Sequence, residues 1–195
     1  MGEATIPIFP LHAVLFPGGP LALRIFEPRY LDMVSRCLRE GSGFGVSLIR
    51  EGQEVGTAAL PYEVGTFGHI SYWQRRADGL LGITLVGERR FRILSSQVGA
   101  DQLMSAEVQW LDDAAASPVP ERFQALAGLL KGILEQLGQP YRKIPRRYED
   151  AAWVGARLAE LLPLSLAQKQ YFLQIEDPVQ RLERLQSMLD AGEVG

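Results

Sequence analysis

The stretch Ile6–Tyr30, IPIFPLHAVLFPGGPLALRIFEPRY, decides how the first part of the chain folds. Apolar runs at Thr5–Phe9 and Leu21–Phe26 are bounded by proline and glycine, which is typical of short β-strands. Pro17-Gly18-Gly19 lies between these runs and predicts a turn. Pro28 follows directly, and proline is favoured at the first position of a helix. The stretch therefore predicts strand, turn, strand and helix in that order.

The residues that follow extend this pattern up to residue 112. Leu31, Val34 and Leu38 recur at helical spacing, and Gly41 suits the helix end. Ala77-Asp78-Gly79 predicts a hairpin turn. Many short strands with close turns favour a barrel or a sandwich. We expect the further strands at Phe44–Arg50, Val55–Leu60, Val64–Gln74, Leu80–Gly87, Arg89–Gln97 and Leu103–Leu111.

The chain changes character after this region. The segment 112–120, DDAAASPVP, is small, polar and proline-bearing, which predicts a linker. We therefore expect a β-barrel subdomain at 1–112, a linker at 113–120 and a helical subdomain at 121–195. Apolar stripes predict helices at Phe123–Leu137 and Trp153–Leu162. Ser165 with Gln168 has the spacing of a capping box, and Asp177-Pro178 predicts the start of the last helix.

The composition is that of an ordinary globular protein. The 195 residues are 47% hydrophobic and 22% charged, with a net charge of -3 and a pI of about 5.5. The chain lacks the overall basic character of many nucleic-acid-binding proteins. Cys37 is the only cysteine, so no internal disulfide can form. Early prolines interrupt the first apolar stretch, so neither a signal peptide nor a membrane span is expected, and the cytoplasm is the expected compartment.

Several segments together resemble a known family. FPLHAVLFPG, LRIFEPRY, GFGVSLI, VGTFGHI and GERRFRI follow one another in the first part, and LAELLPLSLAQKQYFLQIEDPVQRLERL follows in the second. In this order and spacing they resemble the amino-terminal, substrate-binding domain of Lon proteases. The resemblance implies an α+β fold: a PUA-like β barrel with one inserted helix, followed by a carboxy-terminal helical bundle.

The chain departs from a whole Lon protease in two respects. The phosphate-loop pattern G-x-x-x-x-G-K-[ST], whose main-chain N–H groups hold ATP phosphates, occurs nowhere in the sequence. The Ser–Lys peptidase module of the family has no room here either. We therefore expect a stand-alone, bacterial-type protein that is not an enzyme and needs no cofactor.

The resemblance implies that the chain recognises polypeptide. The expected clients are apolar segments of unfolded or damaged proteins, and an ATP-dependent protease is an expected partner in an adaptor role. We expect a shallow apolar groove, partly between barrel and bundle, with main-chain hydrogen bonds from a strand edge. An RNA-binding module of the same barrel type is the main alternative, although the acidic pI counts against nucleic acid. An enzyme acting on a small molecule is a third alternative.

The candidate peptide-binding residues lie in the signature stretch and in the predicted hairpin. They are His12, Phe16, Arg24, Tyr30, Tyr72 and Trp73. An exposed Phe16 would contact unfolded chains, whereas a buried one would close the barrel. Arg24 and Tyr30, with Glu27 and Arg29, would form either a polar anchor for peptide or, as we favour, an internal ion pair. The aromatic and basic side chains of the hairpin suit peptide, RNA or a half-buried strand.

Other candidate sites have weaker support. Arg142, Lys143, Arg146 and Arg147 form a basic cluster in an inter-helix loop. They would contact an anion or a partner, although a solvated loop is favoured. A nucleophile–base pair of Cys37 with His12 or His69 has no supporting motif, and a buried structural thiol is favoured. No spacing of ligands predicts a metal site.

Overall fold

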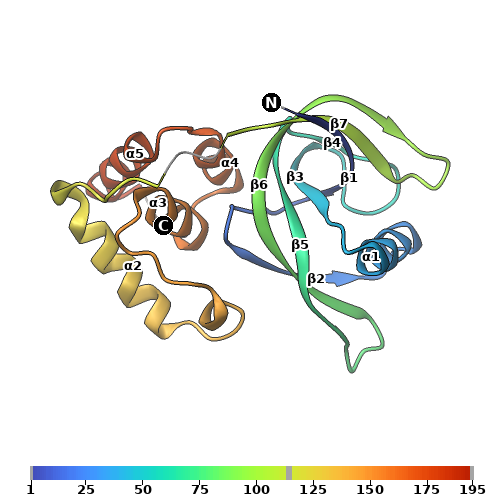
Figure 1. The fold of residues 1–195 in the computed structure, drawn as a ribbon, viewed down its shortest axis with the longest axis horizontal. Helices are drawn as coiled ribbons and strands as arrows, with labels where there is room; N and C mark the ends of the chain where they lie inside the picture. The colour runs from blue at the N-terminus through green and yellow to red at the C-terminus, as the bar shows by residue number, and fades with distance from the viewer. Residues whose placement is uncertain (1, 113–115, 194–195) are drawn as a thin grey trace. The chain divides into compact units, whose positions relative to one another are not determined.

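A computed structural model describes residues 2–112 and 116–193, which form two compact units, Met1–Asp112 and Asp113–Gly195. The described part of the first unit contains seven strands and one α-helix (Figure 1). The strands are β1 (Glu3–Leu11), β2 (Pro20–Ile25), β3 (Phe44–Glu51), β4 (Leu60–Pro61), β5 (Val64–Arg75), β6 (Leu81–Val98) and β7 (Met104–Trp110). Helix α1 (Pro28–Glu40) is inserted between β2 and β3. The predicted α+β fold class is confirmed.

The strands close into a barrel. The antiparallel order β1-β7-β6-β5-β3 returns to its start because β1 also pairs with β3, in parallel, from Ile8 opposite Gly45 to Leu11 opposite Leu48. β4 adds to β3, and β2 adds to β6 outside this ring. Closure satisfies the main-chain hydrogen bonds of the ring strands and removes their free edges. β2 does not take part in that closure.

Phe91 fills the barrel opposite two glycines. A Cβ atom added at Gly45 would lie 2.8 Å from its ring, and one added at Gly65 would lie 2.6 Å from it. Phe91 is fully buried and packs with Ile8, Met104 and Val108. Only glycine at these two positions leaves the space that the Phe91 ring occupies, because protein interiors are close-packed.

Helix α1 begins and ends as predicted. Pro28 occupies its first turn, and Gly41 caps its end in the left-handed conformation, at φ +62°. Its inner face packs on the barrel through Met33, Val34 and Cys37. The thiol of Cys37 is buried, which raises its pKa, and it donates to the carbonyl of Gly43 at 3.5 Å. The prediction of a buried structural thiol is confirmed.

Two strand predictions are wrong. The segments Leu80–Gly87 and Arg89–Gln97 form one continuous strand, β6, which pairs with β5 as a long curved hairpin (Figure 1). A register shift at Glu88, rather than a strand end, separates them. The predicted strand Val55–Leu60 is a loop up to Ala59, because only Leu60–Pro61 pairs with β3. Positive φ angles at Gly52 and Gly56 turn this loop away from a sheet.

The second unit is helical, as predicted. Its described part contains α2 (Gln124–Gln136), α3 (Ala151–Leu161), α4 (Leu166–Gln174) and α5 (Pro178–Asp190), with short 3₁₀ turns at Glu121–Phe123 and Tyr141–Lys143. Ser165 and Gln168 form the predicted capping box of α4. Asp177 accepts hydrogen bonds from Val179 and Gln180 at the start of α5, so both cap predictions are confirmed.

The predicted linker 113–120 includes residues 113–115, which lie outside the described residues. Two of its other residues bond to the start of α3 and to the loop before it. Val119 donates to the carbonyl of Glu149 at 2.9 Å, and the carbonyl of Ser117 accepts from Ala151 at 2.8 Å. Residues 117–119 are therefore attached to the helical unit.

Candidate functional site

The strand β2 presents an edge of the sheet. Its residues pair one for one with β6, from Pro20 opposite Val86 to Ile25 opposite Leu81. Among the strands that the structure describes, β6 is the only one paired with β2. In an antiparallel strand, alternate residues direct their N–H and C=O groups to one side or the other. The far side of β2 therefore carries main-chain groups that can pair with an added strand.

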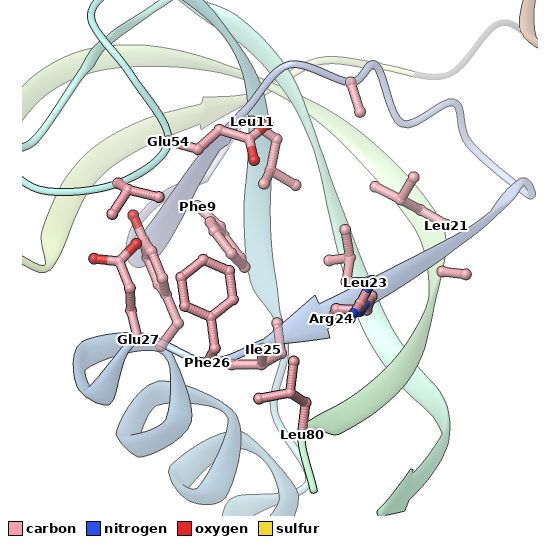
Figure 2. A pocket seen from close by; sticks show the side chains of 14 residues that line it. Phe9, Leu11, Leu21, Leu23, Arg24, Ile25, Phe26, Glu27, Glu54 and Leu80 are labelled. Atoms are coloured by element: carbon pink, nitrogen blue, oxygen red, sulfur yellow. The ribbon is translucent and has the colours of Figure 1, made fainter. Parts of the chain in front are cut away.

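A pocket with a volume of about 550 Å³ borders this strand (Figure 2). All of its lining residues belong to the strand-rich unit. The end of β1, the loop after it, residues Leu21–Ile25 of β2, the start of α1, the loop after β3 and the hairpin turn contribute to it. The lining residues are Phe9, Leu11, Ala13, Leu21, Ala22, Leu23, Arg24, Ile25, Phe26, Glu27, Tyr30, Glu54, Val55 and Leu80. We call this cavity the β2 pocket.

The apolar side of the β2 pocket continues across the sheet. Leu21, Leu23 and Ile25 share one face of β2 because side chains alternate along a strand. Leu23 lies opposite Ile83, and Ile83 lies opposite Trp73 on the next strand. Directly paired residues project from the same face. Trp73, which is 58% exposed, thus extends the same apolar face towards solvent.

The opposite face of the three-stranded region carries other candidates. Ala22 pairs with Thr84, and Thr84 pairs with Tyr72, so Tyr72 projects away from the face of Leu23 and Trp73. Tyr72 is 52% exposed, and its hydroxyl donates to Gln74 at 3.1 Å. Tyr72 and Trp73 were predicted to bind peptide together. Their faces differ, so one peptide strand lying on one face of the sheet would not contact both side chains.

Arg29 and Glu27 form an internal ion pair at the start of α1. The guanidinium of Arg29 lies 3.0 Å from the Glu27 carboxylate, and its side chain is only 5% exposed. It also donates to the carbonyl of Gln102 at 2.9 Å and to that of Glu54 at 3.4 Å. These bonds tie α1 to two loops of the barrel. The geometry therefore agrees with the favoured prediction of an internal ion pair at this end of the stretch Ile6–Tyr30.

Tyr30 lies inside the β2 pocket. Its ring stacks on Phe9 with centroids 3.8 Å apart, and the Arg29 guanidinium lies 4.7 Å from its centroid. Burial raises the pKa of the Tyr30 hydroxyl to about 12; the charge of Arg29 opposes this shift, and those of Glu27 and Glu54 add to it. The phenol therefore stays neutral in ordinary buffers, close to two carboxylates.

His12 lies at the margin of the same region. Its main-chain N–H donates to the Glu54 carboxylate at 2.6 Å, and its ring nitrogen Nδ1 lies 3.5 Å from that group. His12 thus holds a lining residue in place. The other histidine, His69, contacts Glu88 at 2.6 Å. The two histidines and Cys37 each have a different partner, so the geometry gives no support to a nucleophile–base pair.

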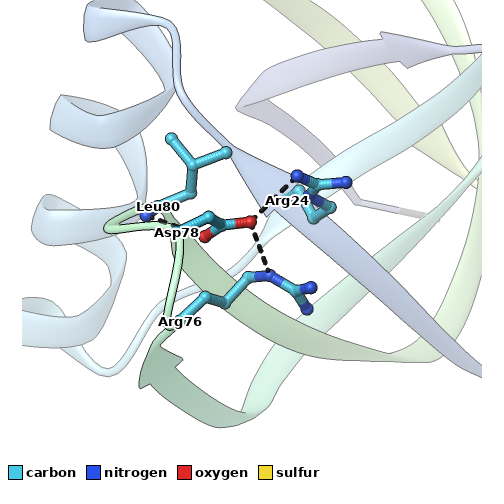
Figure 3. Close-up of polar contacts among 4 residues, drawn as sticks. All are labelled: Arg24, Arg76, Asp78 and Leu80. Atoms are coloured by element: carbon cyan, nitrogen blue, oxygen red, sulfur yellow. Dashed lines mark hydrogen bonds and ion pairs between the residues drawn. The ribbon is translucent and has the colours of Figure 1, made fainter.

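Arg24 is directed to the hairpin turn. Its guanidinium lies 2.9 Å from the Asp78 carboxylate, which also contacts Arg76 at 3.3 Å and accepts from the N–H of Leu80 at 3.1 Å (Figure 3). The Leu80 N–H and the two guanidinium groups hold the pKa of the Asp78 carboxyl below its usual range. Arg24 therefore joins β2 to the β5–β6 turn, in addition to lining the pocket.

Phe16 is buried, with 1% of its surface exposed, so it cannot contact a client in this conformation. This burial agrees with the alternative that Phe16 closes the barrel, and gives no support to the alternative that it contacts clients. Around it, Gly18 donates to the carbonyl of Gly87 at 2.7 Å, and Gly87 donates to that of Gly19 at 2.9 Å. The hydroxyl of Thr66 donates to the carbonyl of Leu15 at 2.6 Å. The loop Leu15–Gly19 is thus an internal closure of the barrel.

The basic cluster Arg142, Lys143, Arg146 and Arg147 lies in the helical unit. All of these side chains are exposed, along the 3₁₀ turn Tyr141–Lys143 and the loop that follows it. No residue of this cluster lines the β2 pocket. A contact of the cluster with an anion or a partner stays a prediction.

In the described residues, no group of three or more His, Cys, Asp or Glu side chains could hold a metal ion. No helix within 2–112 or 116–193 is both long and apolar enough to cross a membrane.

Most of the pocket was missed from the sequence. Phe26 and Val55 are 53% and 56% exposed, although both are large and apolar. Phe26 stands at the end of an apolar run and directly before Glu27-Pro28, where the chain turns into a helix. This position could have indicated the exposure of Phe26. Where a strand ends directly before a helix, the last side chain of the strand has no neighbour in the sheet. Val55 and Glu54 gave no local signal, because they reach the pocket through a loop.

Comparisons with known proteins place the chain in a family. The family described as the ATP-dependent protease La (LON) substrate-binding domain matches residues 5–191. The chain belongs to the Lon substrate-binding domain family. It is 28% identical to a Lon protease of Parabacteroides distasonis, over 95% of this chain and 24% of that protein. It is 25% identical to Lon protease 2 of Herpetosiphon aurantiacus, over 94% of this chain and 23% of that protein.

Solved structures of the family agree with this assignment. A Lon N-terminal domain protein from Xanthomonas campestris is 40% identical, with a TM-score of 0.79 over 94% of this chain and 98% of that one. The N-terminal domain of the Mycobacterium avium complex Lon protease is 18% identical, with a TM-score of 0.65, and shows the shared fold alone. The chain spans about a quarter of the length of the curated Lon proteases that it matches.

Proposed function

We propose that this chain is a non-catalytic polypeptide-recognition module that binds apolar segments of unfolded or damaged proteins along β2. The open edge of β2 beside the β2 pocket is the observation that carries the proposal. Membership of a substrate-binding family supports polypeptide as the ligand.

The proposed mode of binding is addition of a strand. The client's main chain would pair with the free side of β2, which gives affinity without demanding a particular sequence. Alternate client side chains would enter the pocket against Leu21, Leu23 and Phe26, because successive side chains of a strand point to opposite faces. A disordered client loses conformational entropy when it binds, so modest affinity is expected.

A role beside a protease follows from the same proposal. Proteins named Lon protease contain a related domain within a much longer chain. The chain described here would present clients to an ATP-dependent protease, or compete with one for them. It would do so without hydrolysing ATP through a phosphate loop, since the sequence contains no G-x-x-x-x-G-K-[ST] pattern.

The test is a titration of a labelled, permanently unfolded polypeptide, followed by fluorescence anisotropy at two salt concentrations. The natively folded form of the same polypeptide is the control. We expect binding of the unfolded form only, with little change between the salt concentrations, because apolar burial and main-chain pairing dominate. Equal binding of both forms, or of neither, would contradict the proposal.

A pair of variants assigns the binding to the β2 pocket. Phe26→Ser removes an exposed ring that lines the pocket, whereas Leu94→Ser removes an apolar side chain of β6 that is 48% exposed and does not line it. We expect Phe26→Ser to weaken binding by about tenfold, a loss of roughly 1.4 kcal/mol, and Leu94→Ser to leave it unchanged. Equal effects of the two changes would place the binding elsewhere.

RNA binding is a second candidate, favoured by one observation. The exposed Tyr72 and Trp73 precede the exposed Arg75 and Arg76, and aromatic rings beside guanidinium groups can stack on bases. In the same assay, a labelled single-stranded RNA would then bind with an affinity that falls steeply with salt. No binding of that RNA at low salt would eliminate this candidate.

A further inference from the structure

The charges around the β2 pocket are unevenly distributed. Its charged lining residues are Arg24, Glu27 and Glu54. Figure 2 shows Glu27 and Glu54 on one side of the cavity and Arg24 on the other. The charge of Arg24 is offset by Asp78 at 2.9 Å. The charge of Glu27 is likewise offset by Arg29 at 3.0 Å, so Glu54 is the carboxylate that gives its side of the pocket a negative character.

Each of these carboxylates adjoins an exposed apolar side chain. Phe26 precedes Glu27, and Val55 follows Glu54, so that two apolar–acidic pairs from distant parts of the sequence line one cavity. Phe26 and Val55 are 53% and 56% exposed. We call these four residues the acidic mouth. Long basic side chains suit such a surface, because their stems cover apolar groups while their charged ends reach carboxylates.

Glu54 is the more accessible of the two carboxylates. Its side chain is 43% exposed, whereas that of Glu27 is 17% exposed and faces Arg29 at 3.0 Å. One of the Glu54 oxygens accepts from the N–H of His12 at 2.6 Å. A carboxylate has about four acceptor positions on two oxygens, so this bond leaves room for further donors. The raised pKa of Tyr30, to which both carboxylates contribute, supports their proximity to the pocket interior.

We propose that the acidic mouth selects client segments in which a lysine or an arginine adjoins apolar residues. This inference rests on the proposed function and names the class of polypeptide that the same pocket prefers. An arginine would place its planar guanidinium on the ring of Phe26 and donate to Glu54. Client segments with an aspartate or a glutamate at that position would be disfavoured by like charge.

The experiment compares three labelled ten-residue peptides that share one apolar sequence and carry Arg, Gln or Glu at a central position. We expect the Arg peptide to bind about three- to fivefold more tightly than the Gln peptide, the range given by a partly exposed ion pair. We expect the Glu peptide to bind most weakly. The Arg advantage should shrink at high salt, since exposed charge pairs are screened.

A matched pair of variants tests the role of Glu54. Glu54→Gln keeps an oxygen for the His12 N–H and removes the charge, so that the Arg and Gln peptides should bind equally. Glu63→Gln makes the same charge change at an exposed residue that does not line the pocket, and should leave the Arg advantage intact. Thermal unfolding of both variants checks that they are folded. Glu54→Lys should reverse the order and favour the Glu peptide.

The outcomes separate this inference from the function on which it rests. If the Arg and Gln peptides bind the unaltered protein equally well, and Glu54→Gln changes neither affinity, the preference for basic segments is overturned while polypeptide binding stands. If none of the peptides and no unfolded polypeptide binds, the proposed function itself fails.

Discussion

Within the stretch Ile6–Tyr30, the loop Leu15–Gly19 buries Leu15 and Phe16 against the barrel, whereas β2 and Phe26 border open space. Both segments are apolar in sequence. The loop packs closely against β6, because the main chain of Gly87 is hydrogen-bonded to Gly18 and Gly19. Among the described strands, β2 is paired with β6 alone, on one of its two sides. An apolar segment therefore stabilises this fold where both of its sides are covered, and is available for binding where one side is not.

The largest expected effect compares two phenylalanines of this stretch. Phe16 is 1% exposed and Phe26 is 53% exposed. Phe16→Ala should lower the free energy of unfolding by about 3–5 kcal/mol, since it leaves a cavity in the packed barrel. Phe26→Ala should change it by less than about 0.5 kcal/mol. Urea unfolding measures both, and similar losses would contradict the assignment of closure to one segment and binding to the other.

The next effect compares two glycines of β6. A Cβ atom at Gly87 would lie 2.3 Å from the carbonyl oxygen of Phe16, which belongs to the backbone. A Cβ atom at Gly82 would lie 3.2 Å from the flexible side chain of Arg76. We expect Gly87→Ala to destabilise the protein by about 1–3 kcal/mol, and Gly82→Ala to cost less than about 1 kcal/mol. Thermal unfolding of the two variants ranks their stabilities. If Gly82→Ala proved the less stable, the loop Leu15–Gly19 would have to shift easily to make room for the added methyl group.

A smaller effect concerns the buried phenol of the β2 pocket. Burial raises the pKa of Tyr30 to about 12, whereas the unfolded chain has a value of about 10. A group with a raised pKa in the folded state contributes stability below pH 10, and this contribution is lost as the pH rises through 12. At pH 11 the loss is about 1.4 kcal/mol.

Tyr30→Phe removes that titration. The free energy of unfolding of the unaltered protein should fall, relative to that of Tyr30→Phe, by about 1.4 kcal/mol between pH 8 and pH 11. Urea unfolding at the two pH values measures the difference, and the comparison at pH 8 serves as the internal control. A constant difference between the two proteins would show that Tyr30 is accessible to water.

Features set by local chemistry could be predicted from the sequence. The start of α1 at Pro28, its end at Gly41 and the caps at Ser165 and Asp177 depend on neighbouring residues only. These predictions are confirmed because capping needs no distant partner.

Features set by distant partners could not be predicted in this way. Gly87 suggested a strand end, yet it lies within β6 because the backbone of Phe16 approaches it. The burial of Phe16 depends on the same approach. The open edge of β2 depends on which strands pair, and the β2 pocket gathers Phe9, Phe26 and Glu54 from three separate segments. Sequence alone identified the family resemblance and some pocket residues, Arg24 and Tyr30 among them, but not the pocket.

Amide hydrogen exchange, with and without a permanently unfolded polypeptide, tests directly whether clients bind along β2. We expect slower exchange along β2 and at the acidic mouth when the polypeptide is present, and unchanged exchange in the loop Leu15–Gly19. Unchanged exchange along β2, together with slower exchange in the hairpin at Tyr72–Arg76 or in the helical unit, would contradict binding along β2.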